Sequence, residues 1–456
     1  MDRPNLTNDK SMRDLIRLAW PVFVAQVAVM ANGLIDTLMA GHLSSIDLAA
    51  VGIGAAIYAS LFISVTGILL ALSPTVAHLQ GGRRYEEIGE QVRQAAWLAG
   101  VLAVLTIALL TFPEPLLAIA QLTPEVASKV QAYLDAMAWG APAALFFRVF
   151  YGFSAGISRP RPVMVLNLLG LGLKLPLNWI FMHGQLGLPP LGAAGCGVAS
   201  SLIAWLLAIL SWIWCYRQEA YRPYGLFSRW SWPEWTRLAA LARLGLPIGA
   251  TFLVDVTAFT FMALFIARFG PVASGAHQIA SSLAALVFML PTAIGHAAAV
   301  LAGQALGRSE AGAARLVGLR GLQLGLGCAL ILATLIAFGN KTIASLYTQD
   351  SAVQTLTGQL LLLVALYHLA DALQAVAVYL LRSYRKTAIP MLIYALALWG
   401  VGLGGGVMLG LGGVLGPARG PSGFWWAAIA GLWLAGFGVG AYWWHIANKA
   451  TKDSTQ

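Results

Sequence analysis

The sequence is poor in charged residues. Only 10% of its 456 residues are Asp, Glu, Lys or Arg, and 59% are hydrophobic, whereas about a quarter of a typical soluble domain is charged. So few charges exclude a soluble surface and indicate an all-α polytopic integral membrane protein. The net charge of +10 therefore predicts basic loops on one side of a membrane, and we expect no nucleic acid partner.

Cysteine is also scarce, and the common enzyme motifs are missing. The three cysteines, Cys196, Cys215 and Cys328, are scattered and odd in number, so they predict neither a disulfide framework nor a metal site. The absence of a G-x-x-x-x-G-K-[S/T] motif argues against ATP-driven transport by this chain alone. Zinc-ligand spacing, a Ser/His/Asp arrangement and a dinucleotide fingerprint are absent too. We therefore expect no enzymatic activity and no bound cofactor.

Long hydrophobic runs are abundant. Read with a window of about 19 residues, they predict about twelve membrane-spanning helices. The first run follows a short polar segment and has no small-residue cleavage site, so it predicts a first span and not a signal peptide. The predicted spans are 13–38, 48–78, 94–112, 130–153, 162–183, 193–215, 241–266, 276–304, 317–338, 354–381, 389–411 and 424–447.

The loop charges predict the orientation of these spans. If the N-terminus is cytoplasmic, 22 of the 28 Lys and Arg residues fall on the cytoplasmic side and 4 on the outer side. Arg148 and Lys174 fall inside spans. Cytoplasmic loops of membrane proteins carry such an excess of Lys and Arg, so both chain ends are predicted to be cytoplasmic.

The two halves of the chain repeat each other. Residues 15–21 (LIRLAWP) match 241–247 (LARLGLP) at an offset of 226, which continues without a gap to Gly81 and Gly307. Six spans separate the matched segments, so both repeats run in the same direction, as in transporters whose site lies at the repeat interface. We expect two six-helix lobes, 1–216 and 241–456, around a central cavity. The basic, Trp-rich segment 217–240 is predicted to be a cytoplasmic interfacial linker.

Two isolated acids are the main candidates for a site. Asp255 is the only ionisable residue between Arg243 and Arg268, and Asp371 is the only Asp, Glu, Lys or Arg between Asp350 and Arg382. Both are predicted near the midplane, where a charge costs about 2.5–3.5 kcal/mol on insertion scales. Tyr367 lies one helical turn before Asp371 and adds a hydroxyl. The two carboxylates and the phenol together can bind a proton, Na⁺ or a cationic substrate. The alternative is that each acid only forms a hydrogen bond with a neighbouring helix.

Further polar residues fall inside predicted spans. Asp36 lies in the outer half of the first span, where it is either functional or hydrated. Arg148 and Lys174 are deep cations, and each is expected to meet Asp36, a carbonyl or water. Asn178, Gln278 and Lys174 are candidates to line the substrate path, and a helix–helix hydrogen bond is the alternative for Asn178. His277 and His368 are interpreted as polar groups at helix interfaces.

Several segments together resemble one family. The chain is similar to multidrug and toxic compound extrusion (MATE) transporters of the bacterial NorM-like branch, over essentially all the predicted spans. The segments that carry this resemblance are 35–41 (IDTLMAG), 158–162 (SRPRP), 176–181 (PLNWIF), 191–199 (LGAAGCGVA), 252–259 (FLVDVTAF), 276–279 (AHQI) and 370–371 (AD).

The resemblance implies a function. It implies an antiporter of the bacterial inner membrane, working as a monomer, that expels small organic cations in exchange for inward Na⁺ or H⁺. It implies that Asp255, Asp371 and Asp36 are coupling acids, and that Tyr367 and Asp350 lie near the cation route. Asp255 and Asp371 are then the candidate Na⁺ ligands.

The chain departs from this branch at two positions. The branch usually carries Glu where this chain has Asp255, and Asn where it has Lys174. The ammonium puts a Na⁺ site in the N-terminal half in doubt. Because the resemblance also places their spans near each other, we predict that Lys174 pairs with Asp36, directly or through water.

Other function classes remain as alternatives. A lipid or oligosaccharide flippase shares the twelve-span plan, although an anionic lipid favours a cationic cavity. A major-facilitator transporter would carry an Asp-Arg-x-Gly-Arg-Arg-type loop, which Gly81-Gly-Arg-Arg84 only partly matches. A channel differs from an antiporter because its transport does not saturate and is not an exchange.

Overall fold

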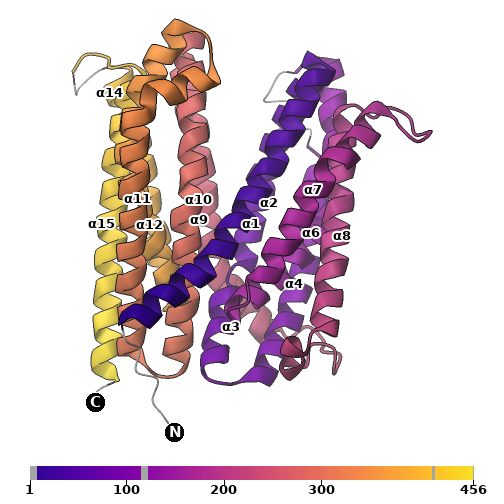
Figure 1. Cartoon of the computed structure of the whole chain (residues 1–456), viewed down its shortest axis with the longest axis vertical. Helices are drawn as coiled ribbons and strands as arrows, with labels where there is room; N and C mark the ends of the chain where they lie inside the picture. The colour runs from indigo at the N-terminus through magenta and orange to yellow at the C-terminus, as the bar shows by residue number, and fades with distance from the viewer. Residues whose placement is uncertain (1–7, 114–121, 413–415, 455–456) are drawn as a thin grey trace. The chain divides into compact units, whose positions relative to one another are not determined.

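Helices make up most of the part of the protein that can be described. The computed structural model describes residues 8–113, 122–412 and 416–454. The helices are α1 (Asn8–Leu43), α2 (Ser45–Leu69), α3 (Leu72–Gly81), α4 (Tyr85–Thr111), α6 (Pro124–Gly156), α7 (Arg161–His183), α8 (Ala193–Arg217), η1 (Glu219–Tyr224), α9 (Trp235–Ala267), α10 (Pro271–Gly307), α11 (Ala311–Tyr347), α12 (Ser351–Ser383), α13 (Ala388–Ala395), the π-helical turn η2 (Leu396–Gly404), α14 (Gly405–Gly410) and α15 (Pro421–Asp453) (Figure 1).

These helices agree with the predicted spans. Within the described residues, eleven helical stretches are long and apolar enough to cross a membrane. Helix α2 and helix α3 form one of them, and α13, η2 and α14 form another. The predicted span 130–153 lies within α6, a helix of 33 residues that also carries Asp135 and Arg148 within its apolar sequence. The all-α membrane fold predicted from the sequence is confirmed.

The chain divides into two compact units. The first unit is Val24–Gly249, and the second unit is Ala250–Gln456 together with the chain up to Phe23. The divisions fall within α1 and α9, the first helices of the two repeats, at positions 226 residues apart, which is also the offset of the repeat. Each division comes two residues after a proline inside the helix, Pro21 or Pro247. The predicted lobes 1–216 and 241–456 stay a prediction.

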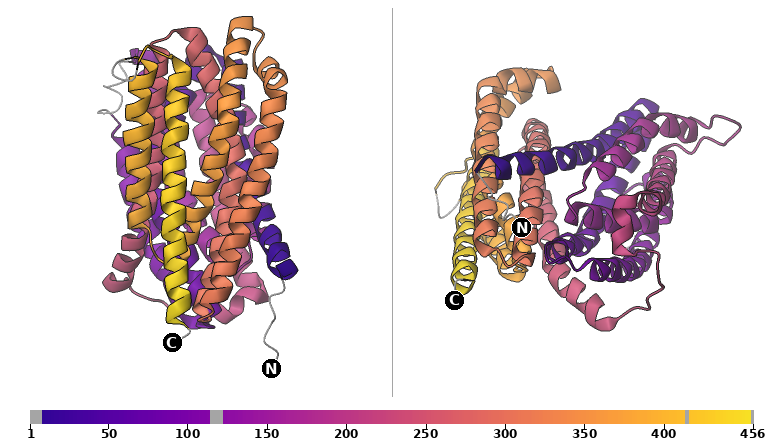
Figure 2. Two further views of the ribbon diagram at one scale, coloured as in Figure 1. Left: turned by 90° about the vertical axis from the view of Figure 1, so that its left-hand side faces the viewer. Right: turned by 60° about the horizontal axis from the view of Figure 1, so that its bottom comes forward.

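Close helix packing organises each unit. In the first unit, α6 packs on α2, α4 and α8. Gly140 allows a close approach to α8, because a Cβ there would lie 2.3 Å from the Ser201 hydroxyl. In the second unit, α12 packs on α10, α11 and α15, and Figures 1 and 2 show these helices side by side. Most side chains of α12, including Asp371, are therefore buried in protein.

Within the first unit, a group of polar contacts, here called the polar clamp, holds the linker 217–240 against α4. The buried Glu90 of α4 accepts hydrogen bonds from Ser231 (2.7 Å), Arg93 (2.8 Å) and Gln94 (2.9 Å). Gln94 donates to the Trp232 carbonyl and accepts from the Glu234 amide, both at 2.8 Å. The adjacent side chains of Trp230, Trp232 and Trp235 are exposed. The predicted interfacial position of this linker stays a prediction.

Replacing Gln94 by Leu is expected to loosen this clamp. The change leaves the Trp232 carbonyl and the Glu234 amide without their partner, at a cost of about 1–3 kcal/mol. Hydrogen–deuterium exchange should become faster in residues 225–236 and stay unchanged in α10 and α12. Gln323→Leu, at a more accessible position of α11, is the matched control. Equal exchange in both variants would show that the clamp does not order the linker.

Candidate functional site

Two carboxyl groups lie together in the second unit. Asp255 is on α9 and Asp371 is on α12, and their charges are close enough to act on each other. Asp371 is 5% exposed, and Asp255 is half-buried. The structure thus brings together the two acids that the sequence singled out. Nothing in the described residues tests their predicted roles.

Neither acid has a cationic partner among the residues that the structure describes. Asp371 makes no hydrogen bond or ion pair with any of them. The nearest Lys or Arg along α12, Arg382, is buried against aromatic rings. Its guanidinium lies 4.1 Å from the centre of the Tyr379 ring and 5.8 Å from that of Phe252. A buried carboxylate that lacks a counter-charge is costly. The pair is therefore suited to take up a proton, a metal cation or an organic cation.

Tyr394 is a member of this site that sequence reasoning missed. Its hydroxyl donates a 2.6 Å hydrogen bond to Asp255 Oδ1 from α13. The only available signal was that Tyr394 carries the sole hydroxyl in the predicted span 389–411. Helix α13 is followed at once by the π-helical turn η2, and such turns are frequent at functional sites. A phenol that donates to Asp255 orients one carboxylate oxygen and leaves the other available.

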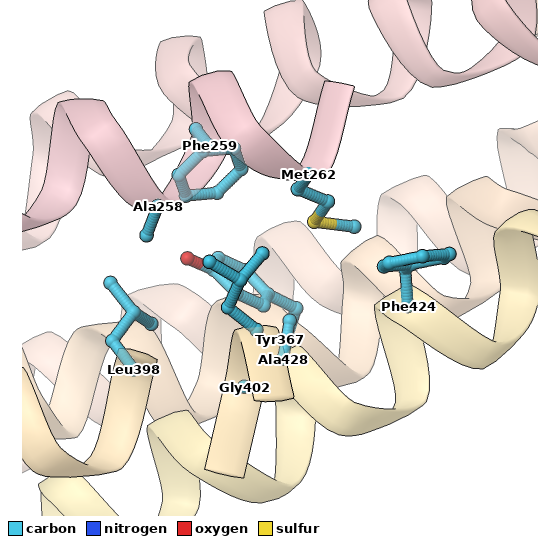
Figure 3. A pocket seen from close by; sticks show the side chains of 9 residues that line it. Ala258, Phe259, Met262, Tyr367, Leu398, Gly402, Phe424 and Ala428 are labelled. Carbon is cyan, nitrogen blue, oxygen red and sulfur yellow. The ribbon is translucent and has the colours of Figure 1, made fainter. Parts of the chain in front are cut away.

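Tyr367 lies beside both acids and at the edge of a small cavity. Its ring packs edge-on against Phe259 at 6.1 Å and Trp425 at 5.6 Å, and its charge environment includes Asp255 and Asp371. Figure 3 shows its hydroxyl directed towards Ala258. The cavity of about 20 Å³ is large enough for about one water molecule. The cavity is otherwise lined by apolar groups from α9, η2 and α15, namely Ala258, Phe259, Met262, Leu398, Gly402, Leu403, Phe424 and Ala428.

The first unit holds a buried ion pair. The Lys174 ammonium of α7 lies 2.8 Å from Asp36 Oδ1 of α1, and the two side chains are 2% and 10% exposed. Asn178 Nδ2 donates to the same oxygen at 2.7 Å. The predicted pairing of Lys174 with Asp36 is confirmed. Asn178 makes the helix–helix hydrogen bond that was its alternative interpretation, and nothing tests its predicted place on the substrate path.

The remaining candidates are Asp350, Gln278 and Arg148. Asp350 caps α12 by accepting hydrogen bonds from the Ala352 and Val353 amides at 2.8 and 3.2 Å. Gln278 is exposed on α10. The Arg148 guanidinium lies 5.8 Å from the centre of the Tyr151 ring, and its predicted pairing with Asp36, a carbonyl or water stays a prediction. The roles of Asp350 and Gln278 in transport stay predictions.

His277 and His368 are both buried. His277 lies 3.4 Å from the Ser281 hydroxyl and packs on the Trp425 ring at 5.9 Å. Neither ring nitrogen of the buried His368 has a hydrogen-bond partner among the described residues. Across those residues, no group of three or more His, Cys, Asp or Glu side chains is placed to hold a metal ion. Any Na⁺ at Asp255 and Asp371 would therefore need hydroxyl, carbonyl or water oxygens as well.

Comparison with known families decides the identity of the fold. The family model MatE matches residues 21–180 and 247–408, one segment in each repeat. The chain belongs to the MATE family. The predicted resemblance is thereby confirmed, and the major-facilitator alternative is excluded. Asp36 and Lys174 lie within the first matched segment, and Asp255, Asp371 and Tyr394 lie within the second.

Curated relatives in the MATE family match nearly the whole chain. A probable multidrug resistance protein NorM of Aromatoleum aromaticum is 39% identical over 425 residues, covering 92% of this chain and 91% of that protein. The multidrug resistance protein MdtK of Pectobacterium atrosepticum is 38% identical over 424 residues, covering 93% of each.

Solved MATE structures share the fold. The outward-facing conformation of a multidrug resistance MATE family transporter superposes with a TM-score of 0.88 at 18% identity, over 97% of both chains. The Vibrio cholerae MATE transporter VcmN in its bent form superposes with a TM-score of 0.84 at 19% identity, over 98% of both. These likenesses show that the helical arrangement is that of MATE transporters.

Replacing Tyr394 by Phe is expected to lower the apparent affinity of this site for Na⁺ during transport. The change removes the hydrogen bond that orients Asp255 for a metal cation, worth about 1–1.5 kcal/mol, so the Na⁺ concentration giving half-maximal transport should rise about five- to tenfold. Tyr347→Phe, at an exposed tyrosine at the end of α11, is the control. The measurement is transport at varied Na⁺ concentration. Equal half-maximal concentrations in the two variants would count against a role for Tyr394.

Proposed function

We propose that this MATE protein is an antiporter that exports small organic cations in exchange for inward Na⁺ or H⁺. The observation that carries the proposal is the pair Asp255 and Asp371, which lie together on membrane-spanning helices without a cationic partner among the described residues. The relatives named as multidrug resistance proteins support a xenobiotic cargo. Asp255, Asp371, Tyr367 and Tyr394 form the coupling site of this proposal.

Exchange follows from the cost of leaving these acids uncompensated. An ionised carboxylate at membrane depth costs several kcal/mol unless a cation or a proton neutralises it. The second unit therefore changes conformation easily when the acids hold a proton, Na⁺ or an organic cation, and with difficulty when they are bare. If the acids must be neutralised whenever the protein changes conformation, the site can release one cation only when another cation replaces it. That condition is antiport by alternating access.

The flippase alternative is weaker in this structure. An anionic lipid requires uncompensated positive charge along its route. Of the two deep cations, Arg148 and Lys174, Lys174 is already neutralised by Asp36 at 2.8 Å and offers no net charge to a phosphate. The acids of the second unit would repel an anionic headgroup. The charges thus favour a cationic cargo over an anionic lipid.

The cellular setting belongs to the same proposal. The excess of Lys and Arg in the predicted cytoplasmic loops supports cytoplasmic chain ends. The bacterial relatives support the inner membrane. Each chain carries both repeats, so we propose that a monomer in the lipid bilayer is the transporting form.

Transport by the purified protein tests the proposal. Proteoliposomes would be loaded with a fluorescent organic cation, and a Na⁺ gradient and a pH gradient would be imposed in separate experiments. We expect saturable release of the organic cation that at least one of the two gradients accelerates. Release that neither gradient changes, or that fails to saturate, would contradict an antiporter.

A further inference from the structure

The Lys174 ammonium lies in a pocket of oxygen atoms contributed by neighbouring helices. Its Nζ is 2.8 Å from Asp36 Oδ1 of α1 and 3.5 Å from the Cys196 carbonyl of α8, and it donates to the Ser200 hydroxyl of the same helix. The Ser200 hydroxyl itself donates to the Cys196 carbonyl at 2.8 Å, so its lone pairs face the ammonium. Each of the three N–H groups of the ammonium thus has one oxygen acceptor.

A further oxygen in this pocket has no partner within the described residues. Asn178 is fully buried and gives its amide hydrogen to Asp36, while its own Oδ1 has no hydrogen-bond partner in that part of the chain. A buried amide oxygen of this kind costs about 1–3 kcal/mol. Carboxylate, amide, hydroxyl and carbonyl oxygens are the ligands that small hard cations take. The first unit therefore contains a donor set for a cation in which a side chain of the protein supplies the charge.

We infer that Lys174 is a tethered cation that permanently fills a monovalent-cation site in the first unit. One consequence of this inference rests on the proposed function: ion exchange is then confined to Asp255 and Asp371 in the second unit. A free ion can enter the first unit only by displacing an ammonium that is covalently held beside Asp36. Displacement would leave that ammonium buried without a counter-charge. The native pocket consequently binds no free Na⁺ or K⁺.

Removing the tether should open the pocket to a free ion. Lys174→Ala deletes the ammonium and leaves Asp36, Ser200, the Cys196 carbonyl and Asn178 in place. The vacated volume and the negative charge of Asp36 then favour a small monovalent cation. Lys174→Asn makes the same deletion and adds one amide oxygen, so it provides a second variant if the alanine variant does not fold.

Ion binding to the purified full-length protein tests the inference. All variants would carry Asp255→Asn and Asp371→Asn, which remove the proposed coupling site and any efflux that depends on it. Binding would be measured with radioactive Na⁺ and with K⁺ as a competitor. Thermal unfolding in NaCl and in choline chloride would report any stabilisation by the bound ion.

The expected results separate this inference from the proposed function. With Lys174 present, we expect no saturable Na⁺ binding and equal Tm values in NaCl and choline chloride. Lys174→Ala or Lys174→Asn should create saturable binding and a Tm that NaCl raises, and adding Asp36→Asn should abolish both. Saturable Na⁺ binding to the protein that keeps Lys174, lost on adding Asp36→Asn, would overturn the inference. The inference is also overturned if the folded Lys174→Ala and Lys174→Asn variants bind neither Na⁺ nor K⁺. Either outcome leaves the antiport proposal standing, because none of these measurements uses efflux.

Discussion

Asp371→Asn is expected to abolish ion-driven efflux while the protein stays folded. The substitution keeps the shape of the side chain and removes its charge, so Asp255 alone is left to hold an ion or an organic cation. Asp371 has no hydrogen bond or ion pair in the described residues, so the loss of charge breaks no structural contact. Removing an uncompensated buried charge is neutral or stabilising. We therefore expect unchanged or higher Tm together with the loss of transport.

Loss of the charge of Asp255 should have the same effect on transport as loss of the charge of Asp371. A longer side chain that keeps the charge at residue 255 should not have this effect. Asp255→Asn should abolish efflux, and it should also lower Tm slightly because it weakens the hydrogen bond from Tyr394. Asp255→Glu keeps the charge and should retain transport. Efflux of an organic cation from proteoliposomes is the measurement, with Glu310→Gln at an exposed acid of the second unit as the control. Normal efflux by either Asn variant would remove that acid from the coupling site.

The second large effect is expected for the buried pair of the first unit. Lys174→Met alone and Asp36→Asn alone each leave a buried charge without its partner, and each should destabilise the protein by about 3–5 kcal/mol. The double variant should recover much of that loss, because both charges are then gone. The interaction energy from the cycle should therefore exceed about 0.5 kcal/mol, the scatter expected for independent sites.

An exposed pair provides the matched control for this cycle. Arg308 and Glu310 lie 2.9 Å apart, almost the same distance, but their side chains are 42% and 43% exposed. An exposed ion pair contributes about 0–1 kcal/mol. Unfolding of the purified variants should thus give a large interaction energy for Lys174 and Asp36 and a small one for Arg308 and Glu310. Additive losses in the first cycle would mean that the buried contact does not stabilise the fold.

The fold could be predicted well from the sequence because membrane helices are recognisable from local composition. A span needs a continuous apolar run, and the isolation of Asp255 and Asp371 within such runs is visible in the sequence itself. The pairing of Lys174 with Asp36 needed more than composition: two deep charges cost less together, and the family resemblance indicated that their spans are neighbours.

What the sequence could not show depends on contacts between distant residues. Tyr394 and Asp255 are 139 residues apart, and only the folded structure reveals their hydrogen bond. Ser231 meets Glu90 across 141 residues, so the linker clamp has no local signal. The charge pattern assigns Arg382 to a cytoplasmic loop, but its position at the end of α12 buries it against Tyr379. Aromatic packing of this kind depends on side-chain direction, which hydropathy does not encode.

One measurement tests the central claim of cation exchange at Asp255 and Asp371 most directly. Proteoliposomes would be loaded with the organic cation, with Na⁺ and pH initially equal on both sides and the membrane potential clamped. Downhill exit of the organic cation should drive uphill entry of Na⁺ or H⁺ in the wild-type protein, and Asp371→Asn should show neither movement. Exit of the organic cation with no entry of either ion would contradict the account.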